Sequence, residues 1–112
     1  MSGSSGIGAA LDAMMTTVKA RRGADPSGSY TASLLAAGPE RCAKKFGEEA
    51  VEAALAGALK QPSELTAEAA DVLYHLAVLL AANGVGWDAV AAALSGRTGQ
   101  SGLEEKAGRP TA

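Results

Sequence analysis

The apolar residues of this chain recur every three or four positions, which is the spacing of side chains on one face of an α-helix. The first such segment covers residues 7–22, where the recurring side chains are Ile7, Leu11, Met14, Met15 and Val18. Turn-forming residues interrupt the pattern over 23–28. Ser29 is then placed to cap a short helix through Ala36, which Gly38 ends. The pattern therefore predicts two helices in the first third of the chain.

Two longer helical segments follow. The first is predicted over 39–59, because a proline suits the first turn of a helix and Pro39 stands there. Residues 61–63 form a connection, and Thr66 is a suitable N-cap for a helix that reaches Asn83. We expect these two helices to lie side by side and antiparallel, since the connection between them is short.

A last short helix is predicted over 87–94, with Trp87 as its anchor, and Gly84 before it is expected to adopt the left-handed conformation that ends a helix. No stretch alternates in the manner of a β-strand. The fold class is therefore predicted to be all-α, an antiparallel bundle of four to five helices. We expect the folded domain to cover residues 9–95, with flexible segments at 1–8 and 96–112.

The composition of the chain bears on whether one copy is sufficient to form a stable core. The 112 residues suit one domain, and 47% of them are hydrophobic by a broad count, but aromatic residues make up only 4%. Much of the apolar content is alanine, which buries little area per residue, so a single copy would have a thin core. We therefore expect the apolar helix faces to be completed by homodimerisation.

Charge and cysteine content restrict the kind of partner and compartment. The net charge is −2 and the basic residues are scattered, apart from a group at 41–45, which argues against nucleic acid as a partner. The single cysteine, Cys42, is expected to be a small buried hydrophobe in a reducing, cytoplasmic protein. The most apolar segment, 69–82, is too short to span a membrane and contains Asp71 and His75, so no membrane partner is expected.

Acidic residues form two groups, one on each of the long predicted helices. Glu48, Glu49 and Glu52 lie at spacings that let all three converge on one point, and Glu68 and Asp71 share one face of the next helix. Clustered carboxylates repel one another unless a cation lies between them. Oxygen ligands suit Mg²⁺, whereas one histidine and one cysteine make a zinc site improbable. The sequence therefore predicts a Mg²⁺ site.

The alternative is that these glutamates are only solvated helix surface, which is the common role of such residues. Asp71 weighs against it, because the surrounding segment 69–76 is apolar and we expect the Asp71 side chain to be buried. A buried carboxylate needs a partner. We also expect His75, one turn later, to orient Asp71 by a hydrogen bond, rather than to act as a metal ligand or general base.

The basic residues before the first acidic group fit the same site. Arg41 and Lys45 lie one turn apart and are predicted to bind substrate phosphates beside the metal. The alternative is simple pairing within the helix, of Lys44 with Glu48 and of Lys45 with Glu49.

At this point the residues resemble a known family. The two acidic clusters are similar to those of the MazG-like, all-α nucleoside triphosphate pyrophosphohydrolases. Within that superfamily, four stretches resemble phosphoribosyl-ATP pyrophosphohydrolases: SYTASLL at 29–35, GPER at 38–41, KKFGEEA at 44–50 and AADVLYHL at 69–76.

The resemblance implies a Mg²⁺-dependent, homodimeric enzyme that cleaves phosphoribosyl-ATP to phosphoribosyl-AMP and pyrophosphate in histidine biosynthesis. It implies Glu48, Glu49 and Glu52 as catalytic residues and substrate contacts by Arg41, Lys45 and Tyr30. The implied metal ligands are Glu48, Glu49, Glu52, Glu68 and Asp71. Which glutamate acts as general base stays open. Two alternatives also stay open: hydrolysis of ordinary or damaged nucleoside triphosphates by the same cluster, and a non-catalytic helical dimerisation module.

Overall fold

The computed structural model describes residues 5–97, which form five α-helices. These are α1 (Ser5–Ala20), α2 (Tyr30–Ala37), α3 (Pro39–Ala58), α4 (Pro62–Ala82) and α5 (Trp87–Arg97). The described part of the chain contains no strand. The structure thus confirms the predicted all-α class and the number of helices.

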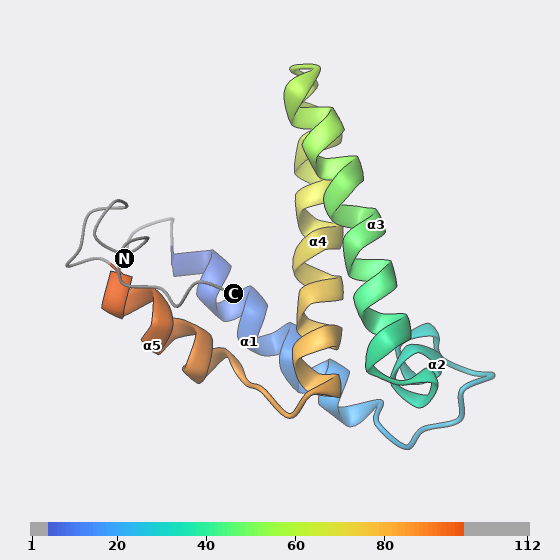
Figure 1. The fold of residues 1–112 in the computed structure, drawn as a ribbon. Helices are drawn as coiled ribbons and strands as arrows, with labels where there is room; N and C mark the ends of the chain where they lie inside the picture. The colour runs from blue at the N-terminus through green and yellow to red at the C-terminus, as the bar shows by residue number, and fades with distance from the viewer. Residues whose placement is uncertain (1–4, 98–112) are drawn as a thin grey trace, which may run out of the picture.

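The two long helices, α3 and α4, form an antiparallel hairpin that stands out from the rest of the molecule (Figure 1). The shorter helices gather at the end of the hairpin away from the α3–α4 connection, where α1 and α2 pack against it. The core lies at this end. The largest of its fully buried side chains are Val18, Cys42 and Val78, from α1, α3 and α4. The other half of the hairpin has no further helix to cover it within the described residues.

Cys42 has the structural role that the sequence predicts. Its thiol is buried and donates a hydrogen bond to the backbone carbonyl oxygen of Leu34, at 3.3 Å. Burial also raises the pKa of the Cys42 thiol. The thiol therefore stays protonated and packs as a small apolar group.

The beginning of α4 differs from the prediction. The helix starts at Pro62, one turn before Thr66, so the prediction of Thr66 as the N-cap was wrong. Proline is favourable at the first helical position because the missing N–H has no partner there in any case. The Thr66 hydroxyl donates instead to the backbone carbonyl oxygen of Pro62, at 2.8 Å, which is an ordinary contact inside a helix.

The C-terminal ends of α3 and α4 have the same backbone geometry. Gly84 has a φ of +71°, and the N–H groups of Gly84 and Val85 donate back to the carbonyls of Ala81 and Leu80. This is the Schellman arrangement expected after Asn83. The end of α3 repeats it with Lys60 as the left-handed residue, at a φ of +57°. A lysine gives no sequence signal for this conformation, which costs about 1 kcal/mol or more for a side chain with a Cβ.

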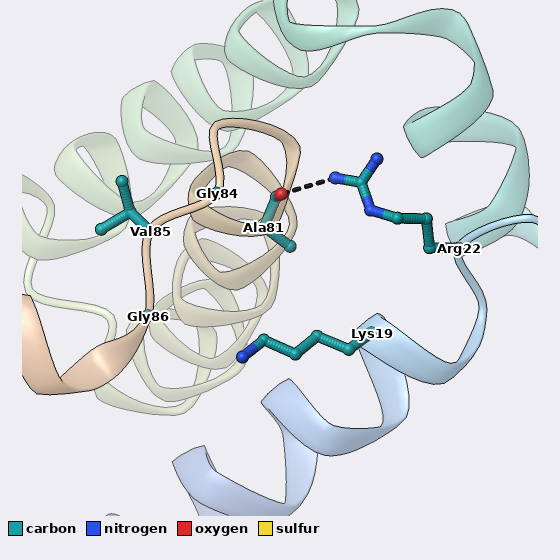
Figure 2. Close-up of a pocket in the computed structure, with 6 residues that line it drawn as sticks. All are labelled: Lys19, Arg22, Ala81, Gly84, Val85 and Gly86. Atoms are coloured by element: carbon teal, nitrogen blue, oxygen red, sulfur yellow. Dashed lines mark hydrogen bonds between the residues drawn. The ribbon is translucent and has the colours of Figure 1, made fainter.

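Arg22 fixes the C-terminal end of α4 to the segment that follows α1. Its guanidinium donates a hydrogen bond to the backbone carbonyl oxygen of Ala81, 59 residues away, at 2.5 Å. Figure 2 shows Arg22 and Lys19 beside a cleft that the loop 84–86 borders. Positive side chains are favourable at a helix C-terminus, so both cations stabilise this end of α4.

The last helix is tied to the first. The Trp87 indole N–H donates to the backbone carbonyl oxygen of Leu11, at 2.9 Å, which confirms Trp87 as the anchor of α5. The helix bounds differ from the predicted ones by a few residues. α1 covers Ser5–Ala20 rather than 7–22, and α5 ends at Arg97 rather than Leu94. The division into a domain and two flexible ends stays a prediction, because 1–4 and 98–112 lie outside the described residues.

By length and composition, α4 could cross a membrane. It nevertheless packs against α1, α2 and α3, and the buried residues of its second half belong to the common core. Its first half carries Glu64, Glu68 and Asp71. Acidic side chains are costly inside a bilayer. We therefore interpret α4 as the central helix of the bundle.

Candidate functional site

Three carboxylates from the two helices of the hairpin lie together. Glu49 on α3 and Glu68 and Asp71 on α4 offer ligand oxygens that all lie within 4.8 Å of one another. The antiparallel packing of α3 and α4 explains the arrangement, because the face of α4 that carries Glu68 and Asp71 is turned toward Glu49. Oxygen atoms at these separations could bind a single divalent cation.

The ionised form of Glu68 is unfavourable in this group. Removal from water raises the pKa of Glu68, and the charges of Glu52, Glu49 and Asp71 raise it further. Its Oε1 atom is buried and has no hydrogen-bond partner among the described residues. A buried carboxylate oxygen without a donor is costly, and a cation between the carboxylates would remove both the repulsion and the missing contact. The residues present therefore fit a divalent metal ion.

The expectation that Asp71 is buried was wrong for the single chain. Its side chain is exposed, whereas Glu49 and Glu68 are half-buried. The neighbouring residues are apolar, as the prediction assumed, but the packing of α3 along α4 leaves the Asp71 side chain exposed. The need for a partner thus arises from the crowding of carboxylates and from Glu68, rather than from burial of Asp71.

Glu52 and Glu48 are not part of the group of three close carboxylates. Glu52 is exposed, but its charge acts on Glu68 and so borders the group. Glu48 is also exposed and pairs with Lys45, with 3.2 Å between Nζ and Oε1. This pair lowers the pKa of Glu48 and raises that of Lys45. Neither alternative pairing considered from the sequence, Lys44 with Glu48 or Lys45 with Glu49, occurs as an ion pair among the described residues.

The predicted substrate-binding residues lie beside the acidic group. Arg41 is exposed near the start of α3, and its charge, with that of Lys44, reaches Glu48. Tyr30 opens α2, whose N-cap Ser29 accepts a hydrogen bond from the Ala32 N–H. Its ring is 52% exposed and lies close enough to Lys45 to influence the pKa of that amine. A cation and an exposed aromatic ring therefore flank the carboxylates.

His75 is buried behind these residues. Its ring contacts Tyr74 edge to face, with 4.8 Å between centroids, and Tyr30 in the same way at 6.2 Å. Burial lowers the pKa of His75, while the charges of Glu49 and Asp71 act in the opposite direction. The structure records no hydrogen bond between His75 and Asp71 within the described chain, so the predicted orienting role stays a prediction.

Thr31 was not singled out from the sequence. Its hydroxyl shares a hydrogen bond with the Tyr74 hydroxyl, at 2.5 Å, and so links α2 to α4 beside His75. Periodicity gave no signal for this pair, because the two residues are 43 positions apart. The only hint was their presence in two of the motif stretches, 29–35 and 69–76.

Comparison with known proteins agrees with this geometry. The family model for phosphoribosyl-ATP pyrophosphohydrolase matches residues 11–98. The phosphoribosyl-ATP pyrophosphatase of Rhodobacter capsulatus is 57% identical over 100 residues, which cover 89% of this chain and 97% of the relative. That of Ruegeria pomeroyi is 54% identical, over 89% of this chain and 95% of the relative. That of a Jannaschia species is 52% identical, over 88% and 97%. The chain belongs to the phosphoribosyl-ATP pyrophosphohydrolase family.

Proposed function

We propose that this protein hydrolyses phosphoribosyl-ATP to phosphoribosyl-AMP and pyrophosphate, the second step of L-histidine biosynthesis, with Mg²⁺ as cofactor and in the cytoplasm. The observation that carries the proposal is the convergence of Glu49, Glu68 and Asp71 from the two helices of the hairpin. A phosphoanhydride substrate is polyanionic, so these carboxylates can approach its phosphates only across a cation. The names of the relatives supply the substrate.

The metal site is proposed to consist of the three grouped carboxylates together with Glu52 and Glu48. Glu68, with its raised pKa and unpartnered Oε1, gives the strongest reason for a cation. Glu48 would have to leave Lys45 to join the site. Bound there, Mg²⁺ would neutralise negative charge that develops on the leaving pyrophosphate.

The chain's own residues have three tasks in this mechanism. A carboxylate oxygen of Glu48, Glu49 or Glu52 accepts a proton from the water that attacks phosphorus. As the bond between the water oxygen and phosphorus forms, the anhydride P–O bond between the α and β phosphates breaks and pyrophosphate leaves. Lys45 and Arg41 hold phosphate oxygens by charge-assisted hydrogen bonds, and Tyr30 borders the nucleoside part.

We also propose that the working unit is a homodimer. Large apolar side chains are exposed along the uncovered part of the hairpin: Val51, Leu55, Leu59 and Leu65. A second apolar surface lies in a groove between α1, α4 and α5, lined among others by Leu11, Leu73, Leu76, Trp87 and Val90. Apolar surface on this scale is unusual on a monomer and typical of an interface between subunits.

Complementation of a histidine auxotroph that lacks this activity tests the proposed function. The chain should restore growth without histidine, and the Glu49→Gln variant, expressed to the same level, should not. In parallel, purified protein should release pyrophosphate from phosphoribosyl-ATP much faster than from a panel of deoxynucleoside triphosphates. Soluble protein that neither restores growth nor turns over phosphoribosyl-ATP would overturn the proposal.

A further inference from the structure

His75 is the one buried polar side chain among the described residues. Its side chain is 6% exposed, and its Nδ1 atom is sealed from solvent with no hydrogen-bond partner among the described residues. An unpaired buried polar atom destabilises the folded state. A phenylalanine would pack between two tyrosines without that cost. Packing alone therefore does not explain why a histidine occupies this position.

The ring is held in one orientation by its neighbours. Tyr74 and Tyr30 both contact it edge to face, with interplanar angles of 72° and 85°. Tyr74 is in turn fixed by its hydrogen bond to Thr31. Edge-to-face contacts of this kind are directional, so the ring nitrogens keep fixed positions. Such rigidity is useful when a side chain must meet a ligand at a defined point.

The two nitrogens of the ring are not equivalent. A neutral imidazole has one N–H and one bare nitrogen, and a buried N–H without an acceptor is less tolerable than a buried lone pair. The hydrogen therefore belongs on Nε2, with the bare nitrogen at the sealed Nδ1. Nδ1 is the ring nitrogen sealed from solvent, which leaves Nε2 as the nitrogen for contact with a ligand.

The position of the ring identifies the acceptor, because His75 lies one helical turn after Asp71 on α4 and its ring contacts that of Tyr30. His75 lies within electrostatic reach of Glu49 and Asp71 on the acidic group and of Lys45 on the phosphate-binding side. On the proposed function, this is the place where the phosphates of the substrate meet the metal and Lys45. An N–H donor at that place faces phosphate oxygens.

From this geometry we propose that His75 is itself a substrate-binding residue, which donates a hydrogen bond from Nε2 to a phosphate oxygen, while Tyr74 and Thr31 position its ring. This assignment differs from an orienting role toward Asp71. It rests on the proposed function, which places the phosphates of the substrate beside the acidic group and Lys45.

Binding of pyrophosphate in the presence of Mg²⁺, measured by calorimetry, tests this contact without turnover. His75→Phe keeps an aromatic ring between the tyrosines but removes both nitrogens. His75→Gln places an amide N–H near the position of Nε2, and His75→Asn places one near that of Nδ1. We expect the dissociation constant for pyrophosphate to rise about tenfold or more in His75→Phe and His75→Asn, and to stay closer to that of the parent chain in His75→Gln.

Binding of Mn²⁺ alone, measured by electron paramagnetic resonance, separates the two roles of His75. A residue that contacts phosphate leaves the affinity for Mn²⁺ unchanged, whereas one that orients Asp71 weakens it when replaced. The assignment is overturned if His75→Phe binds pyrophosphate as tightly as the parent chain, or if the losses of Mn²⁺ and pyrophosphate affinity are equal. Failure of the proposed function would look different, because the parent chain itself would then not hydrolyse phosphoribosyl-ATP.

Discussion

Glu49 on α3 and Glu68 on α4 face each other across the hairpin, with ligand oxygens no more than 4.8 Å apart. Removal from water and the charges of Glu52, Glu49 and Asp71 raise the pKa of Glu68. Two helices that could have packed through neutral side chains thus pack through mutually repelling acids. Such an arrangement is unfavourable for the metal-free chain and favourable once a cation is bound.

The first prediction concerns the stability of the metal-free protein as pH changes. A carboxyl whose folded-state pKa lies above its unfolded value binds more protons when folded, so ionised Glu68 destabilises the fold as pH rises through its raised pKa. In the presence of a chelator, Glu68→Gln should therefore be more stable than the parent chain at pH 7. The advantage should disappear below the ordinary glutamate pKa of 4.5.

Urea denaturation across this pH range measures the effect. Glu64→Gln is the matched control, since Glu64 lies one turn earlier on α4 and outside the group of close carboxylates. The control should show no comparable gain. A pH-independent difference between Glu68→Gln and the parent chain would contradict the account.

The second prediction concerns stabilisation by the metal. A ligand that binds only the folded state raises its stability, by about 2.7 kcal/mol at a concentration 100 times the dissociation constant. Millimolar Mg²⁺ should therefore raise the Tm of the parent chain, whereas Na⁺ at the same ionic strength should not. The increase should be smaller in Asp71→Asn and unchanged in Asp88→Asn, which alters an exposed acid in the first turn of α5. Equal increases in the two variants would place the cation elsewhere.

The third prediction concerns the two helix ends that share one backbone geometry. Lys60→Gly should stabilise the protein by up to about 1 kcal/mol, because glycine adopts a positive φ without a Cβ clash. Gly84→Ala should destabilise it by a similar ~1 kcal/mol for the converse reason. Both positions lie outside the acidic group, so the free energy of unfolding from chemical denaturation reports the backbone effect alone. A loss of stability in Lys60→Gly would show that the lysine side chain has a role of its own.

The fourth prediction concerns the exposed apolar face of the hairpin. Leu55 is 57% exposed and Leu59 is 65% exposed in the single chain. A buried charge in a subunit interface is strongly unfavourable, so Leu55→Glu should shift the protein from dimer to monomer. Light scattering after size-exclusion chromatography measures the mass directly. Gln61→Glu, at the nearby connection, should leave it unchanged, and a monomeric parent chain would exclude the proposed dimer.

The helices were predictable because their signals are local. Apolar spacing and the residues Ser29, Pro39 and Gly84 act within a few positions, and the structure has helix boundaries close to those expected. The start of α4 was harder to predict, because Pro62 suits both a connection and a first helical turn. Thr66 also resembles an N-cap from sequence alone. The turn at Lys60 had no signal at all, because a lysine rarely adopts its conformation.

The candidate site was predictable only in part. The short connection between α3 and α4 allowed Glu49 to be expected near Glu68 and Asp71, and the structure brings these three together. Spacing could not show that Glu48 turns toward Lys45 instead, since residues three apart and four apart are neighbours on a helix. Nor could it show that Asp71 is exposed, because burial depends on what covers a helix. The contacts of His75 with Tyr30, and of Tyr74 with Thr31, join distant segments and required the fold.

Release of pyrophosphate from phosphoribosyl-ATP by the Glu49→Gln variant tests the central claim most directly. The account predicts Mg²⁺-dependent turnover by the parent chain and a loss of about 100-fold or more in Glu49→Gln, equivalent to roughly 3 kcal/mol of transition-state stabilisation. Helical circular dichroism should be unchanged, and Glu40→Gln, at the start of the same helix, should stay fully active. Turnover by Glu49→Gln near the rate of the parent chain would contradict the claim that the carboxylates of α3 and α4 form the reactive centre.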